Sequence, residues 1–388
     1  MKDNRRDAVI VAYGRSPLAK ANKGSFAGMH PLDYGAQTLK GVLNRLPGFD
    51  PALIDDVIVG NAFPQGKCGY NIGRMVAQKA GLPDSVPGVT VNRFCSSGIQ
   101  TIAMAANAIM ADQMDVVIAG GVEQMTGLNM MMPEEYRDQL LEKEIPGLYM
   151  SMGMTAENVA EKYGISRSIM EVMAAESHRK AAIAQASGEF DREIIPITVT
   201  GENGEAFTAD KDEGIRPSTT PEGLAKLKPC FKPEGRLTAA TSSQTTDGAG
   251  FVVLMARETA EKLGYQPIAR FVGFQVAGVP SEIMGIGPVE AVPRVLKRTG
   301  LTIDDMDVIE LNEAFASQAI ACIRTLGLPE EKVNPNGGAM ALGHPLGATG
   351  AVLTSKVLSY LERKGGRYGL ITMCIGGGMG AAGIVEME

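Results

Sequence analysis

The hydrophobic residues of the chain follow two different spacings, and the change between them marks where strands give way to helices. Val89 and Val91 alternate with Thr90 and Asn92, which is typical of a strand. Apolar residues then recur every three or four positions over 98–111, which predicts a helix. The same two spacings predict further elements: a first strand in the apolar run near the N-terminus, strands within 115–121 and 368–378, and helices over 155–164, 166–188 and about 350–363.

Two parts of the chain repeat one pattern of strand, loop, helix and strand. Both 54-IDDVIVGNAF-63 and 303-IDDMDVIELNEAF-315 open with Ile-Asp-Asp, continue into a short apolar strand and end in Asn with Ala-Phe close behind. Val-Asn recurs at 91–92 and 333–334, each time before a loop of small residues and a helix. Generic βαβ patterns also look alike, but these shared details favour a duplication. We therefore expect two similar α/β halves packed together.

The segment 122–246 has a different character from either half. It is rich in methionine at its start, then has two predicted helices, and later becomes rich in proline and lysine. Thr155 is placed to cap the first helix, and Gly188 to end the second. We interpret the segment as an insertion late in the first half, and long insertions usually carry function.

Composition narrows the class of protein. Of 388 residues, 45% are hydrophobic and 21% charged, which predicts a folded chain with a sizeable core. No uncharged apolar run reaches about 18 residues, so no membrane span is expected, and the basic N-terminus runs into a strand rather than a signal peptide. The net charge of −7 argues against a nucleic-acid binder.

The cysteines point to reduced thiols. There are five, without Cys-x-x-Cys spacing, which indicates a cytoplasmic protein and makes a zinc site improbable. Most free cysteines are inert core residues. Cys95, however, stands in Cys-Ser-Ser-Gly at the predicted start of a helix, where unpaired N–H groups and the helix dipole favour a thiolate.

Two glycine-rich stretches carry further candidates. His344 lies in 335-PNGGAMALGHPLGATG-350, where glycines permit close approach of a reacting group, whereas His30 and His178 are interpreted as structural or solvated. Cys374 ends a predicted strand before Gly376-Gly377-Gly378, a position where α/β proteins place active groups. A dinucleotide site is the competing interpretation, but the G-x-G-x-x-G fingerprint and its acid are missing.

The repeat would bring the loops of Cys95 and His344 face to face, with Asn312 at the end of a neighbouring strand. Two thiols near one imidazole suit covalent acyl transfer, in which one thiol is the nucleophile and the other moves protons on the substrate carbon. Glycine N–H groups would hold an oxyanion.

At these residues the sequence closely resembles the thiolase family. The motifs follow the family's order over nearly the whole chain: 91-VNRFCSSGIQ-100, 120-GGVEQM-125, 238-TAATSSQTTDGAG-250, 312-NEAFA-316, 337-GGAMALGHPLGATG-350 and 373-MCIGGGMG-380. A non-catalytic lipid-binding relative on the same fold would have lost the nucleophile or the histidine motif, and this chain keeps both. The resemblance implies a duplicated five-layer αβαβα fold with an inserted loop domain. The division is then an N-terminal half of 1–121 plus 247–267, a loop domain of 122–246 and a C-terminal half of 268–388.

The resemblance also implies a role for each catalytic residue. Cys95 is the acylated nucleophile, His344 the base that activates it, and Cys374 the acid and base at the α-carbon. Asn312 holds a water that completes a first oxyanion hole with His344, and the N–H groups of Cys95 and Gly376 form a second.

Five further positions match substrate contacts of the family. Ser243 would bind the pantetheine of coenzyme A and Arg216 its nucleotide end, while Phe231 and Phe315 line the pantetheine channel and Met152 the acyl pocket. The implied co-substrate is coenzyme A, with no permanent cofactor and no metal.

The implied reaction is thiolytic cleavage of 3-oxoacyl-CoA by coenzyme A, or Claisen condensation in reverse. An acetoacetyl-CoA-specific acetyltransferase is the alternative. Ser151 in 149-YMSMGM-154 replaces the histidine of short-chain biosynthetic members, which favours the degradative branch. The resemblance further implies a homodimer or homotetramer and leaves open a partner subunit of β-oxidation.

Overall fold

One mixed sheet runs through both halves of the chain. The computed structural model describes residues 6–145, 147–201 and 204–388, so the start of the basic N-terminus lies outside the described residues. The strands follow the order β10-β11-β12-β9-β1-β8-β5-β3-β4, with β2 beside β8. Their bounds are β1 (Ala8–Arg15), β2 (Ala19–Lys20), β3 (Asp56–Gly60), β4 (Val89–Val91), β5 (Val116–Glu123), β8 (Thr246–Ala256), β9 (Ala269–Gly278), β10 (Val308–Leu311), β11 (Tyr368–Ile375) and β12 (Met379–Met387).

The pairing of these strands is the same in the two halves. In the first half β3 is parallel to β5, β5 antiparallel to β8, and β8 antiparallel to β1. In the second half β10 is parallel to β11, β11 antiparallel to β12, and β12 antiparallel to β9. The halves join where β1 pairs with β9. This mirrored order agrees with the duplication that the sequence predicts.

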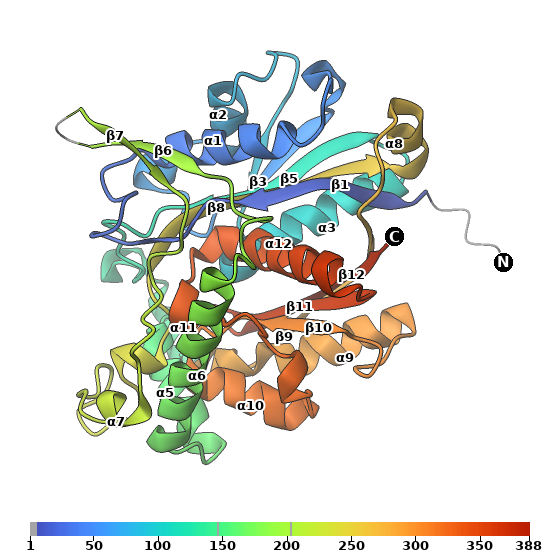
Figure 1. Cartoon of the computed structure of the whole chain (residues 1–388). Coiled ribbons are helices and arrows are strands. Elements are labelled where there is room, and N and C mark those ends of the chain that lie inside the picture. Colours follow the sequence, from blue (N-terminus) through green and yellow to red (C-terminus); the bar gives the residue numbers. More distant parts are fainter. Residues whose placement is uncertain (1–5, 146, 202–203) are drawn as a thin grey trace.

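Helices separate and cover the two halves of the sheet in five layers (Figure 1). The central layer is α3 (Ser97–Met110) with α12 (Leu346–Lys364), and these two helices pack against strands of both halves. A Cβ on Gly350 would lie 2.1 Å from the backbone nitrogen of Ile99, so the close approach of α3 and α12 requires glycine. The outer layers are α1 (Pro31–Leu43) and α2 (Ile72–Lys79) on one side, and α9 (Gly287–Thr299) and α10 (Ala316–Leu326) on the other. A further helix, α8 (Arg257–Leu263), follows β8.

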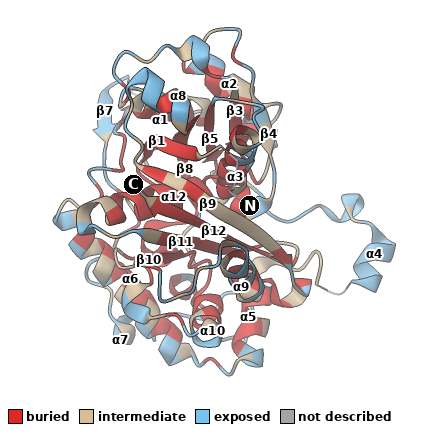
Figure 2. Cartoon of the chain, turned by 90° about the vertical axis from the view of Figure 1, so that its right-hand side faces the viewer, coloured by how far each residue is buried: buried red, intermediate tan, exposed pale blue. Residues whose placement is uncertain are grey.

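The insertion packs against the outer helices of both halves, α1 in the first half and α10 in the second. Figure 2 shows α4 projecting from the body of the molecule with an exposed surface. Met130, Met131 and Met132 precede α4 and are well exposed, whereas Met125 is buried in the core. The elements of the insertion are α4 (Gln139–Glu144), α5 (Met152–Lys162), α6 (Arg167–Ala186), β6 (Ile197–Thr200), β7 (Ala206–Ala209) and α7 (Pro221–Leu224).

Two helix starts differ from the sequence prediction. Thr155 is not an N-cap, because α5 already begins at Met152 and the Thr155 hydroxyl donates to the carbonyl oxygen of Met152 at 2.7 Å. Helix α12 begins at Leu346 rather than near residue 350, with Pro345 at its N-cap. Proline is compatible with the first turn of a helix, since the N–H that it lacks would have no partner there. Gly188 does lie just beyond the end of α6, with φ of 73°.

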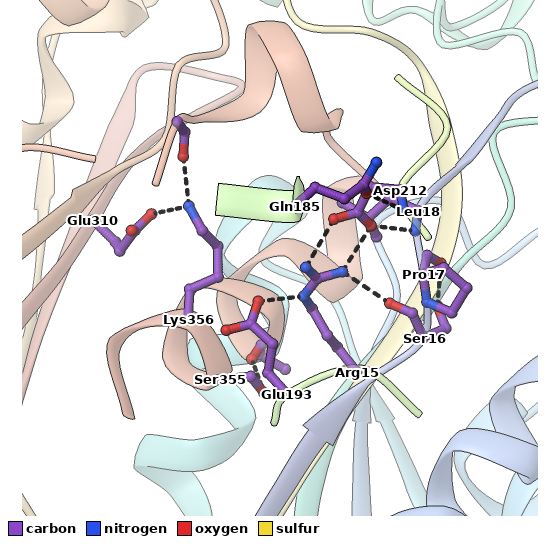
Figure 3. A network of polar contacts seen from close by, with 12 residues as sticks. Arg15, Ser16, Pro17, Leu18, Gln185, Glu193, Asp212, Glu310, Ser355 and Lys356 are labelled. Atoms are coloured by element: carbon purple, nitrogen blue, oxygen red, sulfur yellow. Dashed lines mark hydrogen bonds and ion pairs between the residues drawn. The ribbon is translucent and has the colours of Figure 1, made fainter. Parts of the chain in front are cut away.

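A buried ion network fastens the insertion to β1 (Figure 3). Arg15 is fully buried and donates to Glu193 at 2.8 Å and to both carboxylate oxygens of Asp212 at 2.8 Å. Nearby, the Lys356 ammonium donates to Glu310 and to the carbonyl oxygen of Gly337, both at 2.7 Å. Removing one member of such a network would leave a buried charge uncompensated. The contacts of Lys356 with Gly337 and Glu310 tie the glycine-rich loop before His344 to strand β10.

Candidate active site

Cys95 lies in a strained turn between β4 and α3. The turn is a short 3-10 helix, Phe94–Ser96, and Phe94 has a φ of 44°, which is rare for a bulky residue. Asn92 Oδ1 accepts from the Phe94 N–H at 2.8 Å, and the Ser97 hydroxyl donates to the Phe94 carbonyl oxygen at 2.7 Å. Such strain costs on the order of 1–3 kcal/mol and persists where the surroundings enforce it, often at functional sites.

The Cys95 thiol is protonated at neutral pH, contrary to the thiolate expected from its place near a helix N-terminus. Burial raises its pKa to about 11, and the charge of Glu123 adds to this effect. The backbone N–H groups of Gly376 and of Cys95 itself favour the thiolate and partly oppose the rise in pKa. Desolvation therefore outweighs the helix terminus, and formation of the thiolate requires a base.

The base expected from the sequence is His344. It is buried directly before α12, and its backbone N–H donates to the carbonyl oxygen of Gln244 at 3.0 Å. Its Nδ1 lies 2.6 Å from Thr349 Oγ1, and its Nε2 lies 3.3 Å from the amide nitrogen of Asn312. Because an amide nitrogen only donates, Nε2 is the acceptor and Nδ1 carries the proton. Burial lowers the pKa of His344 to about 3, so the imidazole is neutral at physiological pH.

Cys374 and Asn312 stand side by side at the ends of two parallel strands. Leu311 of β10 pairs with Thr372 of β11, and the Asn312 N–H donates to the Thr372 carbonyl oxygen at 3.0 Å. Cys374 is buried, and desolvation raises the pKa of its thiol well above the ordinary value, followed by the charges of Cys95 and Cys322. The Oδ1 atom of Asn312 is a buried oxygen to which no described residue donates.

The structure thus brings the predicted catalytic residues to one region. Gly376 lies near the turn of Cys95, since a Cβ on Gly376 would lie 4.0 Å from the Phe94 ring, and the charge of Cys95 raises the pKa of Cys374. The turn that holds Cys95 packs against α12, which follows His344, and against β11, which contains Cys374. His344 and Asn312 contact each other directly.

The predicted substrate contacts lie on the insertion side of this region. The ring centroids of Phe231 and Phe315 are 5.9 Å apart in an edge-to-face arrangement, and Met152 packs in the same apolar cluster, which also contains Cys374. The Met152 sulfur would lie 3.5 Å from a Cβ on Gly376. Ser243 lies just before β8 and is partly exposed, and its N–H donates to the Ala314 carbonyl oxygen at 2.9 Å.

Arg216 is exposed, and its backbone N–H donates to Nδ1 of His178 at 3.1 Å. His178 is therefore a buried structural residue and not a solvated one. Burial lowers the pKa of His178 to about 4, with the charges of Arg216 and Lys20 adding to the effect.

We predict that His178 makes stability depend on acid. Its folded pKa lies below the ordinary value of about 6.5, so the unfolded chain binds the proton more readily, and stability is lost as pH falls from about 6.5 toward 4. The stability advantage of the wild type over His178→Gln should shrink by up to roughly 3 kcal/mol between pH 7 and pH 4. Urea unfolding at several pH values measures this difference, and a constant difference would contradict the prediction.

Sequence reasoning missed two side chains that hold the site together. Thr349 contacts His344, and its position five residues further on, in the first turns of a helix, was the available signal. The Gln244 amide donates to the carbonyl oxygens of Gly214, Met340 and Ala341 at 2.9–3.0 Å, which joins the insertion to the loop before His344. Only tertiary structure reveals contacts of this second kind.

Among the described residues, no three His, Cys, Asp or Glu side chains gather in the way that metal ligands would. Within the same ranges, each helix is too short or too polar to span a bilayer.

The chain belongs to the thiolase family. Residues 8–258 match the thiolase N-terminal domain, and residues 265–387 match the thiolase C-terminal domain. The two matches cover both halves of the duplicated sheet and the insertion between them.

Individual relatives are similar to this chain in sequence over nearly its whole length. The chain is 50% identical to the 3-ketoacyl-CoA thiolase of Bacillus subtilis, over 98% of this chain and 100% of that protein. It is 45% identical to the peroxisomal 3-ketoacyl-CoA thiolase A of Mus musculus, over 98% of this chain and 91% of that protein. Among solved structures, the Bacillus anthracis acetyl-CoA acetyltransferase superposes with a TM-score of 0.92 at 38% identity, with full coverage of both chains. Human mitochondrial 3-ketoacyl-CoA thiolase superposes with a TM-score of 0.90 at 36% identity, over 99% of each chain.

Proposed function

We propose that this enzyme cleaves 3-oxoacyl-CoA with coenzyme A, giving acetyl-CoA and a shortened acyl-CoA, through an acyl-enzyme on Cys95. One observation carries the proposal. The turn that holds Cys95 packs against β11, which contains Cys374, and against α12, which follows the neutral His344. The relative with 50% identity is named a 3-ketoacyl-CoA thiolase. This supports the degradative activity over the alternative, an acetoacetyl-CoA-specific acetyltransferase.

The first half-reaction forms the acyl-enzyme. The Cys95 proton moves to Nε2 of His344, and the thiolate attacks the 3-oxo carbon. The bond between the α-carbon and that carbon breaks, its electron pair forms the enolate of acetyl-CoA, and Cys374 supplies the proton that the α-carbon takes. The backbone N–H groups of Cys95 and Gly376 would stabilise an oxyanion beside the Cys95 sulfur, and the free Oδ1 of Asn312 suits a bound water at the second oxygen site.

The second half-reaction restores the enzyme. The proton on His344 passes to the Cys374 thiolate, which restores both groups. His344 then takes the proton of coenzyme A, and the coenzyme A thiolate attacks the thioester on Cys95. The Cys95 thiolate leaves and takes the proton that His344 holds, so each group ends in its starting protonation state. Each step uses side chains of the protein and coenzyme A as the co-substrate.

Several predicted contacts belong to this proposal. Ser243 and Arg216 would bind the pantetheine and nucleotide ends of coenzyme A, Phe231 and Phe315 would line the channel, and Met152 the acyl pocket. The apolar cluster that joins Met152 to Cys374 supports the last of these roles. The boundaries at 121, 246 and 267 remain our proposed division of the chain.

Mass spectrometry of the acyl-enzyme tests the proposal. Incubation with 3-oxohexanoyl-CoA, without free coenzyme A, should leave a butyryl group on the peptide that contains Cys95. Turnover with an unmodified Cys95, or a butyryl group on another residue, would overturn it.

We expect Thr349→Val to slow acylation about tenfold, because the lost hydrogen bond to Nδ1 frees His344 to adopt the other tautomer. Thr349→Ser keeps the hydroxyl and should stay close to the wild-type rate. Single-turnover acylation measures both variants. Equal rates for the Val and Ser variants would show that the hydrogen bond between residue 349 and His344 does not affect acylation.

The cellular setting forms a further part of the proposal. Five free cysteines support a cytoplasmic location, where thiols stay reduced, and cell fractionation tests this. The exposed methionines before α4 support assembly as a homodimer or homotetramer, with or without a β-oxidation partner subunit. Sedimentation of the purified protein distinguishes these states from a monomer.

A further inference from the structure

The glutamate of the motif 120-GGVEQM-125 has no role in the reaction as proposed, yet its surroundings are specific. Glu123 ends β5 and is fully buried. Its Oε1 accepts from the Asn61 amide at 2.9 Å. Its Oε2 accepts from two backbone N–H groups, that of Ala62 at 2.7 Å and that of Gly347 at 2.8 Å. One carboxylate therefore joins the first half of the chain to the second.

On the first side, Glu123 holds the segment that supports the turn of Cys95. The Asn61 N–H donates to the Val91 carbonyl oxygen at 3.0 Å, and the Asn92 amide donates to the Ala62 carbonyl oxygen at 3.1 Å. Asn92 in turn accepts from the N–H of Phe94, the residue before Cys95. The position of the nucleophile is thus connected to Glu123 through a short chain of hydrogen bonds.

On the other side, Glu123 holds the start of the helix that follows His344. Gly347 lies in the first turn of α12, three residues after His344 and two before Thr349. A Cβ on Gly347 would lie 2.6 Å from the Ala62 nitrogen and 2.8 Å from Glu123 Oε2. The contact between the two segments is therefore close enough to exclude any side chain at this position.

We propose that Glu123 is a positioning residue, which fixes the placement of Cys95 relative to His344 by binding Ala62 and Gly347 with one oxygen atom. The inference rests on the roles proposed above for Cys95 and His344. Burial raises the pKa of Glu123 to about 7, and its hydrogen bonds with Ala62, Gly347 and Asn61 act in the opposite direction because they favour the ionised carboxylate. Hydrogen bonds to an ionised oxygen are stronger than those to a neutral one and hold their donors more firmly. A displacement of about 1 Å between reacting groups can cost about 100-fold in rate, so a rigid connection between these two segments matters for proton transfer.

Three variants and one matched control test the proposal. Glu123→Ala removes the acceptor, Glu123→Gln keeps one oxygen without the charge, and Gly347→Ala pushes the segments apart while leaving Glu123 in place. The control is Asp247→Asn. Asp247 is also fully buried and accepts from the N–H groups of Met125 and Thr126 at 2.6 and 2.9 Å, on the segment that directly follows Glu123 rather than on those of Ala62 and Gly347.

The measurements are the rate of acylation by 3-oxohexanoyl-CoA and the KM for coenzyme A, both per folded site as counted from the burst amplitude. Glu123→Ala and Gly347→Ala should acylate about 100-fold more slowly with an unchanged KM. Glu123→Gln should stay within about tenfold of the wild type, and Asp247→Asn should lose stability only.

The outcomes are distinct. Normal acylation in Gly347→Ala overturns the inference, even where Glu123→Ala does not fold. So does a loss in Asp247→Asn that equals the loss in Glu123→Ala. A wild-type enzyme that shows no acylation burst contradicts the proposed function and not the role of Glu123.

Discussion

Cys95→Ala should lose the acylation burst entirely, with steady-state thiolysis falling at least about 10³-fold, because the variant has no sulfur at this position to form the acyl-enzyme. The fold should be retained, since alanine keeps the turn and the hydrogen bonds of Asn92 and Ser97 do not involve the sulfur. A stopped-flow measurement of acetyl-CoA release from 3-oxohexanoyl-CoA records the burst directly.

Cys230→Ala is the matched control for this variant. Cys230 is an exposed thiol outside the catalytic group, so its removal should leave the burst unchanged. A normal burst in Cys95→Ala would mean that the acyl group is carried elsewhere, and the assignment of the nucleophile would be wrong.

The second large effect is expected from Cys374→Ser. This variant should keep acylation of Cys95 but lose proton transfer to and from the α-carbon of the substrate. The variant should still be acylated at Cys95 by acetyl-CoA, because His344 and the N–H groups at Cys95 are unchanged. Condensation and thiolysis should fall by about 10²–10⁴-fold, since a serine hydroxyl is a much weaker proton donor and acceptor for the α-carbon.

Cys322→Ser provides the comparison. Cys322 is equally buried, and the same change places a hydroxyl beside the Gly285 carbonyl oxygen, in a different apolar cluster from that of Cys374. This variant should lose stability but keep both half-reactions. If Cys374→Ser lost acylation and condensation to the same extent, the role of Cys374 as the acid and base would be untenable.

Much of the fold could be predicted because the two halves of the chain share the same residues at corresponding positions. Ile-Asp-Asp and the later Asn with Ala-Phe recur at corresponding strands, and the structure shows those strands in mirrored positions, β3 beside β5 and β10 beside β11. The helix over 98–111 was predicted within one residue at each end, because its apolar residues keep a regular spacing. Helix starts were harder, as α5 and α12 show, because a local N-cap preference says little about where packing lets a helix begin.

The site could be predicted in its residues but not in its electrostatics. The place of Cys95 at the start of α3 indicated a thiolate, whereas the surrounding protein raises the pKa of the thiol to about 11. Desolvation depends on what the fold places around a group, and no local pattern contains that information. For the same reason the hydrogen bonds of Glu123 to Ala62 and Gly347 were invisible in the sequence, because they join residues far apart in the chain.

Thiolysis of a series of 3-oxoacyl-CoA substrates by coenzyme A tests the central claim most directly. The acyl chain of the substrate would range from about four to about sixteen carbons, and kcat/KM would be measured at each length. Each methylene in an apolar pocket changes binding by a measurable amount. We predict values that stay level or rise beyond four carbons, as a degradative 3-ketoacyl-CoA thiolase requires. A steep fall after four carbons would contradict this and would indicate an acetoacetyl-CoA-specific enzyme.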